Sequence, residues 1–424
     1  MSGGKRLFYG WWIAAVAFLF MMLIVGFALY GLPLFYNLWV AEFHWKRADL
    51  QFGNTLSKLV VGPIFGFAAG WVIDRRGPRG VMAAGAIFAA SALLGFSLSA
   101  TLPMFYAFFF LNAFGYLCAG PLPNQVLLSY WFTRLRGRVM GLAYVGIGVG
   151  GMIVPWVIFF LNRQYGWRGS LRILGVLFAV AMGLLLLIVR RRPADLGLCP
   201  DGDERPPEPA VRAPAAKAAR LWPVVKTREF WLLAAGSVLS IAAIGGVMQN
   251  LALYIADIRP KAEVELTKTT IASLTLMSSI AGRIAMGWLA DRFRKKYVML
   301  ATYCLVGLAI PLLILARTHP PLLYVFAVTF GFGLGADYML IPLMAAECFG
   351  LSALSRVLGL IIMSDAIGES LMPYLVAHIR DSTGHYVGGF SLVTVLALLG
   401  ATAILSIRYR DGVPVSRARI EAAS

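Results

Sequence analysis

The sequence predicts an all-α, polytopic membrane protein of twelve transmembrane helices in two six-helix bundles. The chain of 424 residues is 59% hydrophobic and only 14% charged, whereas soluble proteins carry about 25% charged residues. Twelve apolar segments are long enough to cross a bilayer, which takes about 20 helical residues. Short motifs of the first half of the chain also recur in the second half. Composition, segment length and repetition therefore lead to the same fold.

The candidate spans follow one another with short connections in each half. Glycine and proline are frequent within them, because small residues allow close helix packing and neighbouring helices satisfy a broken backbone. The spans are placed at residues 9–37, 49–73, 79–99, 102–130, 136–161, 169–190, 228–256, 266–291, 297–316, 320–349, 352–380 and 386–408.

The distribution of basic residues predicts the orientation. With the N-terminus inside, 26 Lys and Arg fall in cytoplasmic segments and 10 in outer ones, and two, Lys58 and Arg283, are mid-span. Positive charge favours the cytoplasmic side, so both termini are expected in the cytoplasm, in the plasma or inner membrane. Because the net charge of +18 follows this topology pattern, it does not indicate nucleic-acid binding.

Residues 191–227 are rich in proline, alanine and arginine. Such a composition predicts a flexible cytoplasmic linker. The expected organisation is an N-terminal six-helix bundle at 1–190, the linker, and a C-terminal six-helix bundle at 228–424.

Two motifs reveal an internal duplication. The stretch from Gly70 to Arg75 (GWVIDR) recurs from Gly287 to Arg292 (GWLADR), at an offset of 217 residues. The pair Pro155 and Gly166 recurs as Pro373 and Gly384, at an offset of 218 residues. Two independent pairs at nearly one offset indicate repeated halves, an arrangement typical of secondary transporters with a substrate site between the halves.

The first motif continues beyond Arg75 into a glycine-rich turn. The pattern Gly70-x-x-x-Asp74-Arg75-x-Gly77-x-Arg79 resembles the loop 2–3 signature of the major facilitator superfamily. The resemblance implies a cytoplasmic gate, of which Asp291 and Arg292 form the second, shorter copy. The glycines suit a tight turn, and Asp74 suits a contact with helix ends and arginines.

Further motifs resemble the monocarboxylate-porter and oxalate/formate-antiporter branch of that superfamily. They cover nearly the whole chain. They are Tyr9-Gly10-Trp11-Trp12, Glu42-Phe43-His44-Trp45 with Arg47, Tyr130-Trp131-Phe132 with Arg134 to Arg138 and Gly141, Gly146, Gly148 and Gly150 with Pro155, Tyr165-Gly166-Trp167-Arg168, Phe349-Gly350, and Asp381-x-Thr-Gly384-x-Tyr386.

Arg283 lies eight residues before Asp291, which is roughly 12 Å into the membrane at 1.5 Å per residue. A guanidinium cannot shed its proton and is costly to bury. The favoured interpretation is an anion site in a water-filled cavity, and the alternative is a snorkelling arginine or a structural ion pair. The resemblance implies the same role, since an arginine on helix 8 of that branch receives the substrate carboxylate. Lactate carriers also have an acid at the position of Ser279 and a lysine on helix 1, which this chain lacks.

Acidic residues within the later spans are candidates for proton coupling. Asp337 lies near the middle of its span, where it is expected to orient Arg283. Asp365 and Glu369 are four residues apart and share a helix face, and two close carboxylates in an apolar medium favour a retained proton. In the superfamily helix 2 packs against helix 11, so Lys58 is expected to meet one of them. The alternative is static neutralisation of Arg283 and Lys58.

The resemblance also implies that spans one, four, seven and ten line the cavity. Polar residues on these spans are candidates for substrate binding, or they hold helices together. They are Tyr30, Asn112, Tyr116, Gln249, Asn250 and Tyr338.

The expected function is secondary active transport of small organic anions by alternating access. Monocarboxylates such as lactate or pyruvate, coupled to protons, are favoured. The alternatives are an organic anion exchanger of the oxalate/formate type, a drug exporter of the same superfamily and a receptor without transport. No nucleotide-binding loop, nucleophile set or metal-ligand spacing occurs in the sequence, which disfavours an ATP-driven pump and an enzyme. The expected partners are the lipid bilayer, the anion and protons, with no cofactor, no metal, no nucleic acid and a monomeric chain.

Overall fold

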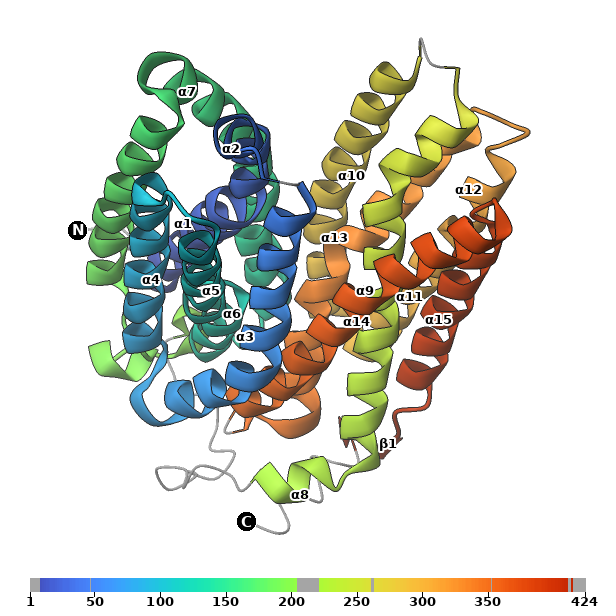
Figure 1. The fold of residues 1–424 in the computed structure, drawn as a ribbon. Coiled ribbons are helices and arrows are strands. Elements are labelled where there is room, and N and C mark those ends of the chain that lie inside the picture. The colour runs from blue at the N-terminus through green and yellow to red at the C-terminus, as the bar shows by residue number, and fades with distance from the viewer. Residues whose placement is uncertain are drawn as a thin grey trace, which may run out of the picture. The chain divides into compact units, whose positions relative to one another are not determined.

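The computed structural model describes residues 8–45, 47–203, 221–260, 263–351, 353–410 and 413–414. The chain divides into two compact units, Met1–Ala219 and Arg220–Ser424. The division falls inside the stretch in which the linker is expected. Figure 1 shows that both units consist of long, closely packed helices.

The first unit begins with a rod that is helical from Gly10 to Phe43 but changes its helix type on the way. Its elements are α1 (Gly10–Met21), the π-helical η1 (Met22–Gly31), the 3-10 helix η2 (Leu32–Phe35), α2 (Tyr36–Phe43), α3 (Arg47–Arg76), α4 (Pro78–Leu98), α5 (Leu102–Ala119), α6 (Pro121–Trp131), α7 (Arg136–Ile188), and the 3-10 turns η3 (Pro193–Leu196) and η4 (Pro200–Gly202).

The second unit has the same plan, preceded by one short helix and followed by a small antiparallel hairpin that pairs Tyr409 with Pro414. Its elements are α8 (Leu221–Val225), α9 (Arg228–Ile258), α10 (Val264–Arg292), α11 (Lys295–Ala309), α12 (Pro311–Leu315), α13 (Leu322–Phe349), α14 (Leu354–Thr383), α15 (Val387–Leu405), β1 (Tyr409–Arg410) and β2 (Val413–Pro414).

Within the described residues, nine helices are long and apolar enough to cross a membrane, or ten if the bent α3 is counted as one span. The 53-residue α7 breaks at Gly166, whose φ of 64° is left-handed, and therefore supplies two spans. Helix α10 is 29 residues long and completes a six-plus-six arrangement. The twelve-helix fold predicted from the sequence is thus confirmed, with most span ends within a few residues of the expected positions.

Glycines allow the first rod to lie directly against α7. A Cβ atom at Gly150 would lie 3.0 Å from Gly26 Cα, and one at Gly146 would collide with the backbone oxygen of Phe18. The second unit has the same device between α10 and α13, where a Cβ at Gly282 or Gly335 would collide with the facing backbone oxygen. In both units glycine therefore brings helix backbones into contact, as expected for helices packed in lipid.

The first part of the expected flexible linker is held against the first unit. The Asp201 carboxylate accepts hydrogen bonds from the backbone N–H groups of Thr133, Arg134 and Leu135, at 2.7–3.1 Å. Arg191 donates to the backbone oxygen of Asp74 at 3.1 Å. The Asp201 carboxylate thus satisfies exposed N–H groups before α7, and the flexibility of the linker stays a prediction. Residues 204–220 lie outside the described part of the chain.

Candidate functional site

Arg283 is buried on α10 in the interior of the second unit. Its side chain is 8% exposed, and Nη1 donates a hydrogen bond to Ser279 Oγ, one turn earlier on the same helix, at 2.9 Å. Ser279 Oγ in turn donates to the backbone oxygen of Leu276 at 2.7 Å. The Ser279 hydroxyl therefore binds the arginine from one helical turn earlier on the same helix.

Two buried aspartates of the second unit are each bound by a serine of α9. Asp337 on α13 is fully buried and Asp365 on α14 is 3% exposed. Ser240 donates to Asp337 Oδ1 at 2.7 Å, and Ser237 Oγ lies 2.8 and 2.9 Å from the two oxygens of Asp365. Because the serines are three residues apart, one face of α9 binds both carboxyl groups.

Both aspartates are buried, and the hydrogen-bond donor to each is a serine hydroxyl. Asp337 Oδ2 has no hydrogen-bond partner among the described residues, and neither has the buried hydroxyl of Tyr303 on α11. A carboxylate in such a place costs several kcal/mol unless a cation balances it. The second unit therefore buries two carboxyl groups whose hydrogen-bond donors are serine hydroxyls.

Glu369 and Tyr338 meet at a more open position between α13 and α14. The Tyr338 hydroxyl donates to Glu369 Oε2 at 2.9 Å, and Glu369 is exposed. The structure thus joins two predicted site residues through a contact that the sequence did not indicate. Arg283 Nη1 donates to Ser279, and Asp337 Oδ1 accepts from Ser240. The expected orientation of Arg283 by Asp337 stays a prediction.

The predicted polar binding residues have differing environments. Asn250 is buried, and its amide donates to the backbone oxygens of Gly246 and Pro373, at 2.9 and 3.1 Å. This asparagine holds α9 against α14. Gln249 on the adjacent position is exposed. In the first unit Asn112 is buried and Tyr116, one turn later on α5, is half-buried, while the side chain of Tyr30 lies outside the described part.

Lys58 is exposed on α3. Its expected contact with Asp365 or Glu369 joins the two units and stays a prediction. The carboxyl group of Asp365 is satisfied within its own unit by Ser237.

The predicted gate motif has the same local geometry in both copies. The Arg75 guanidinium lies 4.0 Å from the Trp71 ring centre, and Arg292 lies 5.1 Å from Trp288. Both are cation–π contacts, which the shared Gly-Trp-x-x-Asp-Arg spacing produces because residues four apart share a helix face.

Glycines with positive φ values lie at breaks between helices in both units. Gly77 follows the first gate motif with a φ of 84°, and Gly70 is buried in α3 while Arg79 is exposed at the start of α4. Gly166 and Gly384, the second repeated pair, both have left-handed φ values, 64° and 79°. An L-residue with a side chain rarely adopts this conformation. The duplication inferred from the sequence thus recurs in the backbone.

The motifs that carry the family resemblance pack against one another in the first unit. Tyr9 lies against Trp131, with ring centres 5.6 Å apart, and donates to the backbone oxygen of Ile188 at 2.8 Å. Near the break in α7, Arg168 forms an ion pair with Glu42 at 3.1 Å, and the Trp167 indole donates to the same carboxylate. Segments far apart in the sequence therefore close both ends of this bundle.

Ser237, Ser240 and Tyr303 were missed by sequence reasoning. A weak signal existed, since the two serines occur three residues apart in an apolar span. Hydroxyl residues are common in membrane helices and usually bond to their own backbone. Their partners are 97 and 128 residues away, so their role depends on tertiary packing.

Comparison with known proteins agrees with this architecture. The family model described as Major Facilitator Superfamily matches residues 14–267 and 260–423. The proton:xylose symporter XylE, in a structure bound to 6-bromo-6-deoxy-D-glucose, superimposes with a TM-score of 0.74 at 14% identity, covering 98% of this chain and 99% of that one.

Curated relatives are similar at low identity. Monocarboxylate transporter 13 of Rattus norvegicus is 27% identical over 410 residues, which are 94% of this chain and 89% of the relative. A probable hexose phosphate transport protein of Chlamydia trachomatis is 25% identical over 423 residues, 94% of this chain and 90% of the relative. Since the family model covers nearly the whole sequence, the chain belongs to the Major Facilitator Superfamily and is a multi-pass membrane transporter rather than an enzyme.

Proposed function

We propose that the protein is a secondary active transporter of small organic anions, with monocarboxylates such as lactate or pyruvate as favoured substrates and protons as the coupling ion. The observation that carries this proposal is Arg283, which is buried on the 29-residue helix α10. A planar guanidinium binds a carboxylate through two parallel hydrogen bonds, and it keeps its charge at any physiological pH.

The relatives support the anion class. Monocarboxylates and hexose phosphates, which occur in the names of two of them, differ in size but share an anionic group that a guanidinium can bind. A drug exporter for lipid-soluble cations would leave Arg283 without a role. We therefore assign selectivity for anions to Arg283, and the choice of a particular anion to the groups around Arg283.

Proton coupling is supported by the hydroxyl-bound aspartates. Ser237 and Ser240 donate to Asp365 and Asp337 without neutralising them. A protonated carboxyl group removes the cost of burying the charge. When water enters during transport, the charged form becomes less costly, so protonation is tied to conformation. We propose Asp365 and Asp337 as proton carriers, with Glu369 and Tyr338 nearer the exposed surface.

A vesicle assay tests the function. Purified protein in sealed vesicles is given labelled lactate, pyruvate, oxalate, formate or glucose 6-phosphate, with and without an inward proton gradient. Monocarboxylate accumulation that requires both the protein and the gradient, with acidification of the lumen, is the expected result. Protein-free vesicles are the control, and absence of anion uptake above that control contradicts the proposal.

Anion exchange is the second candidate, and the hexose phosphate relative favours testing it. An exchanger accumulates labelled substrate only in vesicles preloaded with unlabelled anion, and the proton gradient has no effect on the amount. Accumulation in empty vesicles therefore separates symport from exchange. The identity of the best anion in either assay reports the substrate class directly.

A further inference from the structure

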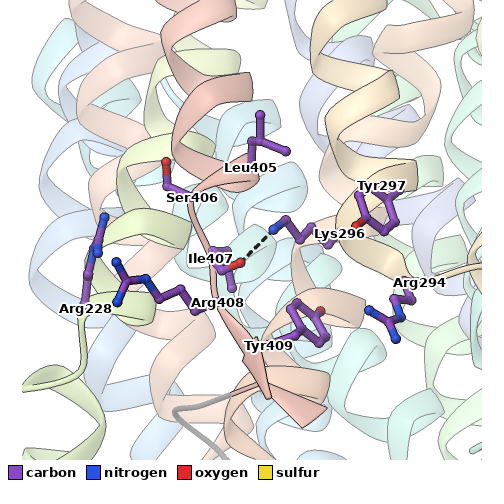
Figure 2. A pocket seen from close by; sticks show the side chains of 9 residues that line it. All are labelled: Arg228, Arg294, Lys296, Tyr297, Leu405, Ser406, Ile407, Arg408 and Tyr409. Carbon is purple, nitrogen blue, oxygen red and sulfur yellow. Dashed lines mark hydrogen bonds between the residues drawn. The ribbon is translucent and has the colours of Figure 1, made fainter. Parts of the chain in front are cut away.

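A hollow of about 760 Å³ lies at the end of the second unit where α9 and α11 begin and α15 ends. Figure 2 shows Arg228 and Arg408 on one side of the segment that follows α15, and Lys296, Tyr297 and Arg294 on the other. Its volume is within the roughly 300–1,000 Å³ of small-molecule sites. The lining residues are Arg228, Arg294, Lys296, Tyr297, Leu405, Ser406, Ile407, Arg408 and Tyr409.

The lining of this hollow is strongly basic. Four of the nine lining residues are arginine or lysine, and none of the nine is acidic. Arg228 and Arg408 are exposed and make no hydrogen bond or ion pair with the described residues. Lys296 Nζ donates to the backbone oxygen of Ile407 at 2.7 Å, which fixes its position beside the hollow. Arg294 stacks over Tyr409, 5.7 Å from its ring centre.

The nearest acids do not cancel this charge. Glu347 is bound by Lys295 at 2.9 Å and by the Tyr409 hydroxyl at 2.6 Å. Burial and the Glu347 charge raise the pKa of the Tyr409 phenol, which therefore stays neutral and donates. Glu229 is buried beneath the surface beside Arg228. The guanidinium groups of Arg228, Arg294 and Arg408 thus remain for an external anion.

Exposed apolar and aromatic side chains line the hollow or lie within three residues of its lining in the sequence. Trp231, three residues after Arg228, is 61% exposed, Tyr297 is 53% exposed and Leu405 is 49% exposed. Tryptophan and tyrosine are enriched at the level of lipid headgroups. An anion bound here has hydrocarbon-facing surface directly beside it, which suits acyl chains better than a freely soluble ion.

We propose that this hollow binds the phosphate group of an anionic phospholipid. Arginine forks match the oxygens of a phosphate ester, and basic pockets between spanning helices on the cytoplasmic side suit such headgroups. Inorganic phosphate offers the same oxygens without acyl chains. A lipid held between the starts of α9 and α11 and the end of α15 ties these three segments together.

Native mass spectrometry of the full chain in detergent tests the site. Phosphatidylglycerol is titrated against the wild type and the variant Arg228→Gln/Arg294→Gln/Arg408→Gln. Phosphatidylcholine, a zwitterionic lipid that carries the same phosphate but no net charge, is the comparison. The variant is expected to bind phosphatidylglycerol at least roughly tenfold more weakly, because each basic residue near the headgroup contributes to affinity. Equal affinity of the wild type and the variant overturns the proposal, as does equal binding of the two lipids.

A matched control removes the same charge elsewhere. Arg163→Gln/Arg172→Gln/Arg317→Gln changes three exposed arginines that do not line the hollow, and it is expected to retain wild-type affinity. If the control variant loses as much affinity for phosphatidylglycerol as the hollow variant does, net charge alone governs binding. That result would overturn the proposed binding site.

Inorganic phosphate at matched ionic strength distinguishes the two sources. It is expected to leave phosphatidylglycerol bound. If phosphate displaces the lipid from the wild type and the hollow substitutions prevent this displacement, the site binds the soluble ion. That result would overturn the proposal that the ligand is a lipid. If the triple variant does not fold, judged by its thermal unfolding, Arg408→Gln alone is titrated, with an expected loss of roughly threefold and the same two overturning outcomes.

Discussion

The two units differ in the chemistry of their buried polar groups. In the first unit, the described buried polar side chains within the spans are amides and hydroxyls, such as Asn124 and Gln125. Asn124 donates to the backbone oxygens of Ala119 and Gly120, where α5 gives way to α6. Arg136 is also buried, but it lies at the first turn of α7 and donates to the backbone oxygens of Phe132 and Ser129.

The second unit places ionisable groups in the corresponding interior. Arg283, Asp337 and Asp365 are all buried on its spans. Both units share the same stacked Trp–Arg pairs and the same left-handed glycine breaks. The two units therefore share a duplicated backbone arrangement but bury different polar groups. We infer that the binding of anions and protons is concentrated in the second unit.

The largest expected effect is that of Arg283→Gln. Loss of a charge-assisted hydrogen bond to a buried group costs about 1.5–3 kcal/mol, so anion binding should weaken at least roughly tenfold. Binding is measured by competition of unlabelled lactate or pyruvate in the vesicle assay. Arg283→Lys keeps the charge but loses the fork, and it should lie between the wild type and Arg283→Gln.

The matched control for that variant is Arg317→Gln, which removes an exposed arginine of the same unit. It should leave affinity unchanged. If Arg283→Gln binds anions as well as the control does, Arg283 has only a structural role and the second unit loses its assigned anion site.

Asp365→Asn and Asp337→Asn should uncouple substrate from protons. Asparagine still accepts the serine hydrogen bond but cannot take up a proton, so folding should persist and gradient-driven accumulation should fall at least roughly fivefold. Proton flux per transported anion is measured with a pH-sensitive dye inside the vesicles. Asp203→Asn, an exposed acid of the first unit, is the control.

This assignment would be abandoned if both aspartate variants carried substrate and protons at the wild-type ratio. A ratio changed in Asp365→Asn alone would narrow the carrier to the residue on α14 and leave Asp337 as a neutral, serine-bound group.

Packing between α10 and α13 should contribute a smaller effect. Gly335→Ala places a methyl group against the backbone oxygen of Ser279, and overpacking costs about 1–3 kcal/mol. A lower unfolding temperature in detergent, with weaker anion binding because Ser279 positions Arg283, is the expected result. Gly183→Ala, which meets no atom within 4 Å, should leave stability equal or higher. If the Gly335→Ala protein is as stable as this control, α10 and α13 can move apart to make room for the methyl group without loss of stability.

The smallest expected effect on anion binding is that of Asn124→Ala in the first unit. The substitution removes two hydrogen bonds at the junction of α5 and α6, and each is worth about 0.5–1.5 kcal/mol. Thermal unfolding should detect this loss, whereas the anion dissociation constant should stay within about twofold of wild type, well under the 1.4 kcal/mol of a tenfold change. A change in affinity comparable to that of Arg283→Gln would remove the distinction between the two interiors.

Several features of the candidate site were accessible from the sequence. The burial of Arg283 follows from its distance to the nearest charged segment, and the break at Gly166 lies between the expected spans 136–161 and 169–190. The meeting of Tyr338 with Glu369 was not accessible, although both residues were candidates. Their contact depends on how α13 and α14 are rotated about their own axes, which no local pattern encodes.

The sequence by itself determined the number, length and order of the spans, because the apolar thickness of a bilayer sets how many helical residues must be uncharged. It also determined the duplication and the mid-span position of the arginine. Tertiary structure alone decided that Ser237 and Ser240 bind the two aspartates, and that Arg228, Arg294 and Arg408 converge on one hollow. The reason is physical: lipid-facing hydrophobicity constrains each helix separately, whereas polar partners are chosen by the rotation and packing of helices far apart in the chain.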